Sequence, residues 1–151
     1  MGLHGNGGGC GIDGIEAWPE RPPPDGRLVR RWTPSSVAEL PGIRDELRGV
    51  VGQDSEQPRD TVEVLVLLFD ELLSNGLRHG YPPVVAELRA TEQEWVLEVS
   101  DQAAEVAPEP DLERDRAQGG MGLLLIAGLA SAYGWFGRGS RKSVWGATGI
   151  A

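Results

Sequence analysis

The chain has a single cysteine, no long apolar run and no surplus of basic residues. Cys10 stands alone, which excludes a disulfide within the chain and agrees with a reducing compartment, so we expect a cytoplasmic protein. No stretch reaches the roughly 18 apolar residues that a membrane span needs, and we expect neither a membrane segment nor a signal peptide. The formal net charge of −9 leaves no basic stripe that could replace counterions on phosphates, which argues against nucleic-acid binding.

What is present predicts one folded domain with an extension before it. A chain of 151 residues can bury a single core, and 25% charged residues provide a soluble surface. Residues 1–26 are rich in glycine and proline and have few bulky apolar side chains to offset the entropy of ordering. We therefore expect a flexible extension over 1–26 and a domain over 27–151.

The spacing of apolar residues predicts the elements of that domain. A first helix is expected over 36–51, with a start only at Pro41 as the alternative, because proline inside a helix costs about 3 kcal/mol. A longer helix is expected over 59–79, where Gly80 and Pro82-Pro83 stop it. The remaining predicted elements are strands at 28–32, 84–90 and 94–100, an acidic lid at 103–118, a buried helix at 122–132, and a hairpin of strands 132–137 and 143–147 around Gly139.

The longer helix carries an acid and an amide four residues apart. On a helical wheel Glu71 and Asn75 lie at the edge of the apolar stripe, with Arg78 beside them, whereas Asp70 and Ser74 point to water. A half-buried carboxylate can take a proton and a half-buried amide can bind a hard cation such as Mg²⁺. Taken alone, such a pair is more often a solvated rim. The stripe itself consists of Leu65, Leu68, Phe69, Leu72 and Gly76.

Two further motifs follow in order along the chain. The strand at 94–100 leads into Asp101, and the run Gln118-Gly119-Gly120-Met121-Gly122-Leu123 opens an apolar helix. In this order the motifs resemble those of the GHKL ATPase superfamily, which includes gyrase, the heat-shock chaperone, histidine kinases and mismatch-repair ATPases. The greatest likeness is to the bacterial anti-sigma factor serine/threonine kinases, and it covers roughly residues 31–150.

The resemblance rests on three segments. The N-box of the family matches 71–76, and His79-Gly80-Tyr81 continues it. The second glycine box, Gly-x-Gly-Leu, matches 120–123, and the closing hairpin matches 133–135 with 142–145. The resemblance implies an α+β two-layer sandwich, in which about three helices cover one face of a mixed, mostly antiparallel sheet.

The first glycine box departs from the family pattern. Its Asp is kept as Asp101, but Ala103 and Glu105 replace the two glycines. Glycine there lets the backbone pass close to a bound base without a Cβ, so the replacement bears on nucleotide affinity.

The resemblance also implies ATP and Mg²⁺ as cofactors and a role for each matched residue. Glu71 would be the catalytic residue, which orients or deprotonates an attacking hydroxyl, and Asn75 would bind the Mg²⁺. Asp101 would accept a hydrogen bond from the adenine amine. The other residues expected at the nucleotide are Arg78, His79, Ala103, Gly120, Met121, Gly122 and Leu123.

Three functions remain open at this point. The first is a serine/threonine kinase that phosphorylates an anti-sigma antagonist of the STAS type and holds a sigma factor. The second is a nucleotide-dependent binding module that has lost phosphoryl transfer, and the third is a histidine-kinase catalytic domain that lacks its dimerisation helices. Relatives of this kind often form homodimers, and Trp135, Phe136 and Trp145 are candidates for such a surface.

Overall fold

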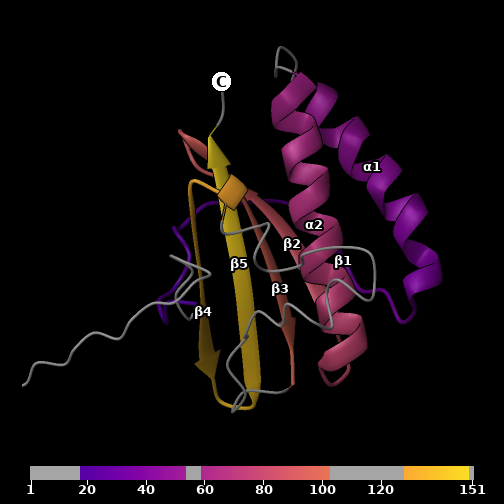
Figure 1. The fold of residues 1–151 in the computed structure, drawn as a ribbon, viewed down its shortest axis with the longest axis vertical. Coiled ribbons are helices and arrows are strands. Elements are labelled where there is room, and N and C mark those ends of the chain that lie inside the picture. The colour runs from indigo at the N-terminus through magenta and orange to yellow at the C-terminus, as the bar shows by residue number, and fades with distance from the viewer. Residues whose placement is uncertain (1–17, 54–58, 103–127, 150–151) are drawn as a thin grey trace, which may run out of the picture.

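One face of an antiparallel sheet is covered by helices (Figure 1). The computed structural model describes residues 18–53, 59–102 and 128–149. Within them the five strands have the order β1-β2-β3-β5-β4, and α1 and α2 lie on the same face. The elements are β1 (Arg27–Trp32), the 3-10 turn η1 (Val37–Glu39), α1 (Leu40–Gln53), α2 (Arg59–His79), β2 (Val85–Ala90), β3 (Glu94–Asp101), β4 (Ala132–Arg138) and β5 (Arg141–Gly149).

This arrangement confirms the expected α+β fold. All four pairings among the five strands are antiparallel, and the described residues add one isolated parallel bridge, between Glu20 and Trp135. The expected lid, at 103–118, lies outside the described residues, as do residues 122–127 of the third expected helix, at 122–132. The remainder of that helix is described: residues 128 and 129 are helical, whereas 130 and 131 are not and β4 begins at Ala132, so the helix ends earlier than expected.

The starts of the helices follow from local chemistry. α2 has the bounds that the sequence predicts. α1 begins at Leu40, after η1, whose N-cap Ser36 accepts a hydrogen bond from the backbone N–H of Ala38 at 3.0 Å. Pro41 therefore falls in the first turn of α1, where its missing N–H has no partner to lose. α1 also continues to Gln53, two residues beyond the end that the sequence predicts.

The main core lies between the helices and the sheet. The apolar stripe of α2 is fully enclosed, and the ring of Phe69 packs edge-on against that of Trp32 with 5.2 Å between centroids. One expectation for α2 is wrong. Asp70 does not point to water, because its carboxylate forms an ion pair with Arg44 on α1 at 3.3 Å. The wheel places Asp70 off the sheet-facing stripe, and α1 occupies that side of α2 instead of solvent.

The segment 18–26, which we call the strap, lies on the sheet. Trp18 is only 3% exposed, and its ring lies 4.7 Å from that of Tyr133 on β4. The backbone N–H of Arg21 donates to the carbonyl of Trp135 at 2.8 Å, and the N–H of Trp135 donates to the carbonyl of Pro19 at 3.0 Å. From Trp18 onward, the chain therefore differs from the expected flexible extension, because it uses the unpaired edge of β4. Residues 1–17 lie outside the described residues.

The strap also covers Trp145. The indole N–H of Trp145 donates to the carbonyl of Arg21 at 2.9 Å, and the Arg21 guanidinium lies 5.6 Å above the ring. Trp145 is consequently only 2% exposed. It therefore cannot line an open dimer surface, which is the role that the sequence suggested for it. Trp135 and Phe136 are half-buried.

Candidate functional site

The C-terminal half of α2 descends onto the end of β3. A Cβ placed on Gly76 would lie 3.1 Å from the Val99 Cγ1, which is an unusually tight contact. One turn later, a Cβ on Gly80 would lie 2.5 Å from the Asp101 Oδ2, which is closer than real Cβ atoms come. Glycines at both positions thus allow the helix to approach the strand and bring its last turn against Asp101.

Asp101 is the deepest acidic group of this region. It is 3% exposed, and it shares the helix-facing side of β3 with Val99 and Leu97. The backbone just beyond it is held by a hydrogen bond from the Gln102 N–H to the Tyr81 carbonyl at 2.9 Å. Carboxylate oxygens are hydrogen-bond acceptors, so Asp101 places an acceptor between the end of α2 and the sheet.

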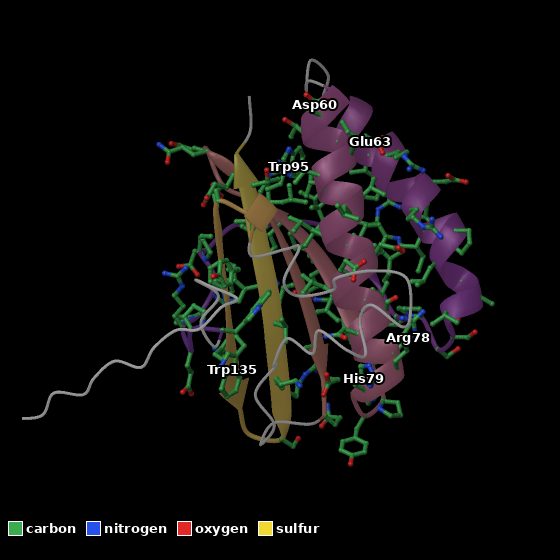
Figure 2. The ribbon with its side chains drawn as sticks, in the orientation of Figure 1. Asp60, Glu63, Arg78, His79, Trp95 and Trp135 are labelled. Carbon is green, nitrogen blue, oxygen red and sulfur yellow. The ribbon has the colours of Figure 1, made fainter. Side chains whose placement is uncertain are left out.

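The acid and the amide of α2 lie one helical turn apart. Glu71 and Asn75 are both half-buried, as their place at the edge of the stripe predicts. Asn75 adjoins Gly76, so it sits where α2 contacts β3. Arg78 and His79 are exposed in the last turn, and Figure 2 shows both at the end of α2 opposite to Asp60 and Glu63. Cations at a helix C-terminus complement its dipole.

The structure therefore brings together part of the predicted site. Glu71, Asn75, Arg78 and His79 lie on α2, and Asp101 lies at the strand end on which this helix closes. The other expected nucleotide contacts lie outside the described residues: Ala103, Gly120, Met121, Gly122 and Leu123. Glu105 lies outside them as well.

The donor set fits a nucleotide better than a protein-held metal. In the described part of the chain, no group of three or more His, Cys, Asp or Glu side chains could hold a metal ion. A divalent cation at this site would thus take the Asn75 amide oxygen together with oxygens of a ligand, which is how Mg²⁺ usually binds beside phosphates. Asp101 suits the exocyclic amine of a purine, since that amine is a donor.

Two residues of this region escaped the sequence analysis. Gly80 was assigned as a helix stop and as part of the continuation of the N-box, whereas the structure shows that it makes room for the Asp101 carboxylate. Lys142 stands directly across from Asp101 in the β3–β5 pairing and is 8% exposed. Its place in the alternation of β5, two residues before the buried Val144, is the signal that could have identified it.

A buried carboxylate at a strand end, beside a helix that carries an acid and an amide, is the arrangement that the GHKL resemblance implies. The chain belongs to this family: the model of the histidine kinase-like ATPase domain matches residues 33–145. The GHKL resemblance is thereby confirmed, and with it ATP binding as the property of the domain. Neither of the two described helices is long and apolar enough to cross a membrane.

The fold is also similar to a solved structure. The chain matches the crystal structure of the RsbU and RsbW domains of Rv1364c from Mycobacterium tuberculosis with a TM-score of 0.58 and 13% sequence identity. The match covers 81% of this chain and 33% of that chain, so this protein spans about a third of the length of that structure. Among curated proteins the comparison finds no match.

Proposed function

We propose that the protein is a serine/threonine kinase that transfers the terminal phosphoryl group of Mg–ATP to a small anti-sigma antagonist of the STAS type, and that it also holds a sigma factor. One observation carries this proposal. Glu71 and Asn75 lie half-buried one turn apart on the helix that closes on Asp101, so the candidate proton acceptor, the candidate metal ligand and the candidate adenine-reading carboxylate share one region. Such a kinase would act in the cytoplasm.

Asp101 would select adenine. The exocyclic amine of adenine is a donor, whereas guanine presents a carbonyl oxygen at the same position. A buried carboxylate facing that oxygen would leave two acceptors opposed, and such a mismatch costs about 1–3 kcal/mol. We therefore expect the site to bind ATP more tightly than GTP.

Asn75 would bind the cation, and Glu71 would accept the proton of the attacking hydroxyl. Bound Mg–ATP supplies the phosphoryl group, and the Asn75 amide oxygen would be the protein ligand of the cation. Glu71 would accept the proton of the attacking serine or threonine hydroxyl as that oxygen bonds to phosphorus and ADP departs. The proton ends on the Glu71 carboxylate, so charge and atoms balance.

The test is a phosphoryl-transfer assay with labelled ATP and candidate antagonists. Acid-stable phosphate on the antagonist supports the serine/threonine assignment, whereas acid-labile phosphate would point to histidine. Glu71→Gln should keep ATP binding and lose transfer, because the shape is retained and the base removed. Asn75→Ala should instead weaken Mg²⁺-dependent binding. An equal loss of ATP affinity in both variants would show that Glu71 is structural.

The second candidate is a nucleotide-dependent binding module without transfer. Ala103 and Glu105, which replace the two glycines of the first box, favour it, because a Cβ and a negative charge stand where the family has neither. Replacing both by glycine should tighten ATP binding if this candidate holds. Nucleotide-dependent capture of a sigma factor without any labelled antagonist would decide in its favour.

A further inference from the structure

The face of the sheet that α1 and α2 leave uncovered carries a groove of its own. The strap crosses this outer face from β4 to β1, and a cavity of about 480 Å³ lies between the strap and the strands. This volume is within the roughly 300–1,000 Å³ of small-molecule sites. Pro23 and Pro24 line it on the strap side, and Glu98, Ser100, Arg138 and Arg141 are among the residues that line it on the sheet side.

Two arginines face each other at this groove. Arg138 and Arg141 are direct partners across the two-residue turn, which is made possible by Gly139 at a φ of 62°. Like charges directly opposite in an antiparallel pair are destabilising. Among the residues that the structure describes, neither guanidinium forms an ion pair, although the chain as a whole carries a net charge of −9. An anion between them would relieve the repulsion.

Both guanidiniums are held at the groove by neighbouring groups. Arg141 donates to the hydroxyl of Ser100, and the guanidinium of Arg138 lies 5.5 Å from the centre of the Phe136 ring. Ser100 and Ser143 are partners in the β3–β5 pairing, each 8% exposed, and both hydroxyls line the groove. Guanidinium forks with hydroxyl donors are the groups that bind phosphate or carboxylate oxygens.

Three acids line the groove, Asp25, Glu87 and Glu98, and the two that lie on strands differ in their pairing. Glu87 is engaged by Arg31 at 2.7 Å and by Arg89 at 2.6 Å. Glu98, on the same outer face, forms no ion pair with any described residue and is half-buried. Glu98 lies two residues before Ser100 on β3, and two residues of a β-strand span roughly 7 Å. A ligand whose anionic end meets the arginines would thus place an amine within reach of Glu98.

We propose that this groove binds a small zwitterionic phosphate monoester, of the aminoalkyl phosphate class. The phosphate lies between Arg138 and Arg141 with the hydroxyls of Ser100 and Ser143 as further donors, and the ammonium group pairs with Glu98. The site is on the opposite face of the sheet from α2 and does not depend on the proposed kinase activity.

The test is a calorimetric titration of the full chain with phosphoethanolamine, O-phosphoserine, methyl phosphate and ethanolamine. The two zwitterionic phosphates should bind at least about tenfold more tightly than methyl phosphate, and ethanolamine should not bind measurably. Arg138→Ala with Arg141→Ala should abolish binding of all the phosphates. Arg48→Ala, which removes a guanidinium from the distant α1, should leave every affinity unchanged.

A charge-retaining variant separates a loss of binding from a loss of the fold. Arg138→Lys with Arg141→Lys keeps the charge and removes the forks, so it should weaken phosphoethanolamine by about tenfold while the melting temperature is kept. Glu98→Gln should bring phosphoethanolamine down to the affinity of methyl phosphate. Retention of phosphate binding in the double alanine variant would overturn the proposal. Competition by Mg–ATP for the same phosphates would overturn it too, by placing them at the nucleotide site.

Discussion

Gly80 is the residue on which the geometry of the candidate site most directly depends. Gly80→Ala introduces a methyl group 2.5 Å from the Asp101 Oδ2 and 2.8 Å from the Gly76 carbonyl. We expect the Asp101 carboxylate to be displaced, at a cost of about 1–3 kcal/mol in stability, with weaker ATP binding as a consequence. Thermal melting and an ATP titration measure the two effects.

The matched control for this change is Gly49→Ala on α1. A Cβ on Gly49 meets nothing within 4 Å, so alanine there should stabilise the helix by about 0.5–1 kcal/mol. If Gly80→Ala behaved like Gly49→Ala, the close approach of α2 to Asp101 would not be needed for the site.

Glu87 should make the stability of the fold sensitive to acid. Its burial raises the pKa of the carboxyl, but hydrogen bonds and charges from Arg31 and Arg89 outweigh that effect and hold the pKa below its usual value. The unfolded chain then binds the proton more tightly than the folded one. The contribution of Glu87 is accordingly complete above the ordinary glutamate pKa of about 4.3 and is lost as the pH falls through the lower, folded pKa.

Urea unfolding between neutral and acidic pH tests this contribution. Glu87→Gln should unfold more easily than the natural chain at neutral pH and should lose less stability on acidification. Arg89→Gln should flatten the pH dependence in the same direction, because one of the two groups that lower the pKa is removed. Parallel curves for Glu87→Gln and the natural chain would contradict the assignment.

Among the elements, the strap is the one whose contribution to stability differs most from what its sequence predicts. Trp18→Ala removes a ring that is 3% exposed and in contact with Tyr133. Truncation of a buried tryptophan costs about 3 kcal/mol or more, so the melting temperature should fall by roughly 6–12 °C. Deletion of residues 1–26 should produce at least as large a fall, although the sequence alone predicts none.

Pro22→Ala is the control within the same segment. Pro22 is exposed, and surface substitutions usually change stability by less than about 0.5 kcal/mol. A melting temperature for Trp18→Ala equal to that of Pro22→Ala would mean that the strap contributes nothing and is an extension after all.

The elements that local patterns define were predictable from the sequence. The apolar period of α2 and the stop at Gly80 gave its bounds, and Gly139 marked the turn of the β4–β5 hairpin. The strap was not predictable in this way, because the bonds of Arg21 reach Tyr133 and Trp145, more than 100 residues further along the chain. The ion pair of Asp70 with Arg44 depends in the same way on which side of α2 receives α1.

The site was predictable to the extent that motifs name residues. The motifs identify Asp101 and Asn75 as site residues, and the half-buried position of Asn75 follows from the period of the helix. The depth of Asp101 does not follow, because it depends on how closely α2 approaches β3 across the core. Gly80 and Lys142 acquire their significance only from that distance and from the strand pairing.

At the scale of the whole molecule, the sheet separates two surfaces of different chemistry. α2 and the candidate nucleotide residues occupy one face, while the groove with its arginines, together with residues 22–26 of the strap, occupies the other. The two ligand sites lie on opposite sides of the sheet, so changes at one site should leave ligand binding at the other nearly unchanged.

Nucleotide binding should be visible as an increase in the stability of the whole domain. A ligand that binds only the folded state at about 100 times its dissociation constant adds about 2.7 kcal/mol, which corresponds to roughly 5–11 °C in melting temperature for a chain of this size. Mg–ATP should give this rise and Mg–GTP a much smaller one, because the Asp101 carboxylate meets a donor in adenine and an acceptor in guanine.

Asp101→Asn should melt within a few degrees of the natural chain without nucleotide. It should also show a smaller difference between ATP and GTP, since an amide can donate as well as accept. Equal rises with ATP and GTP in the natural chain would show that Asp101 does not read the base, and the deep carboxylate would then serve the packing of α2 against β3 alone.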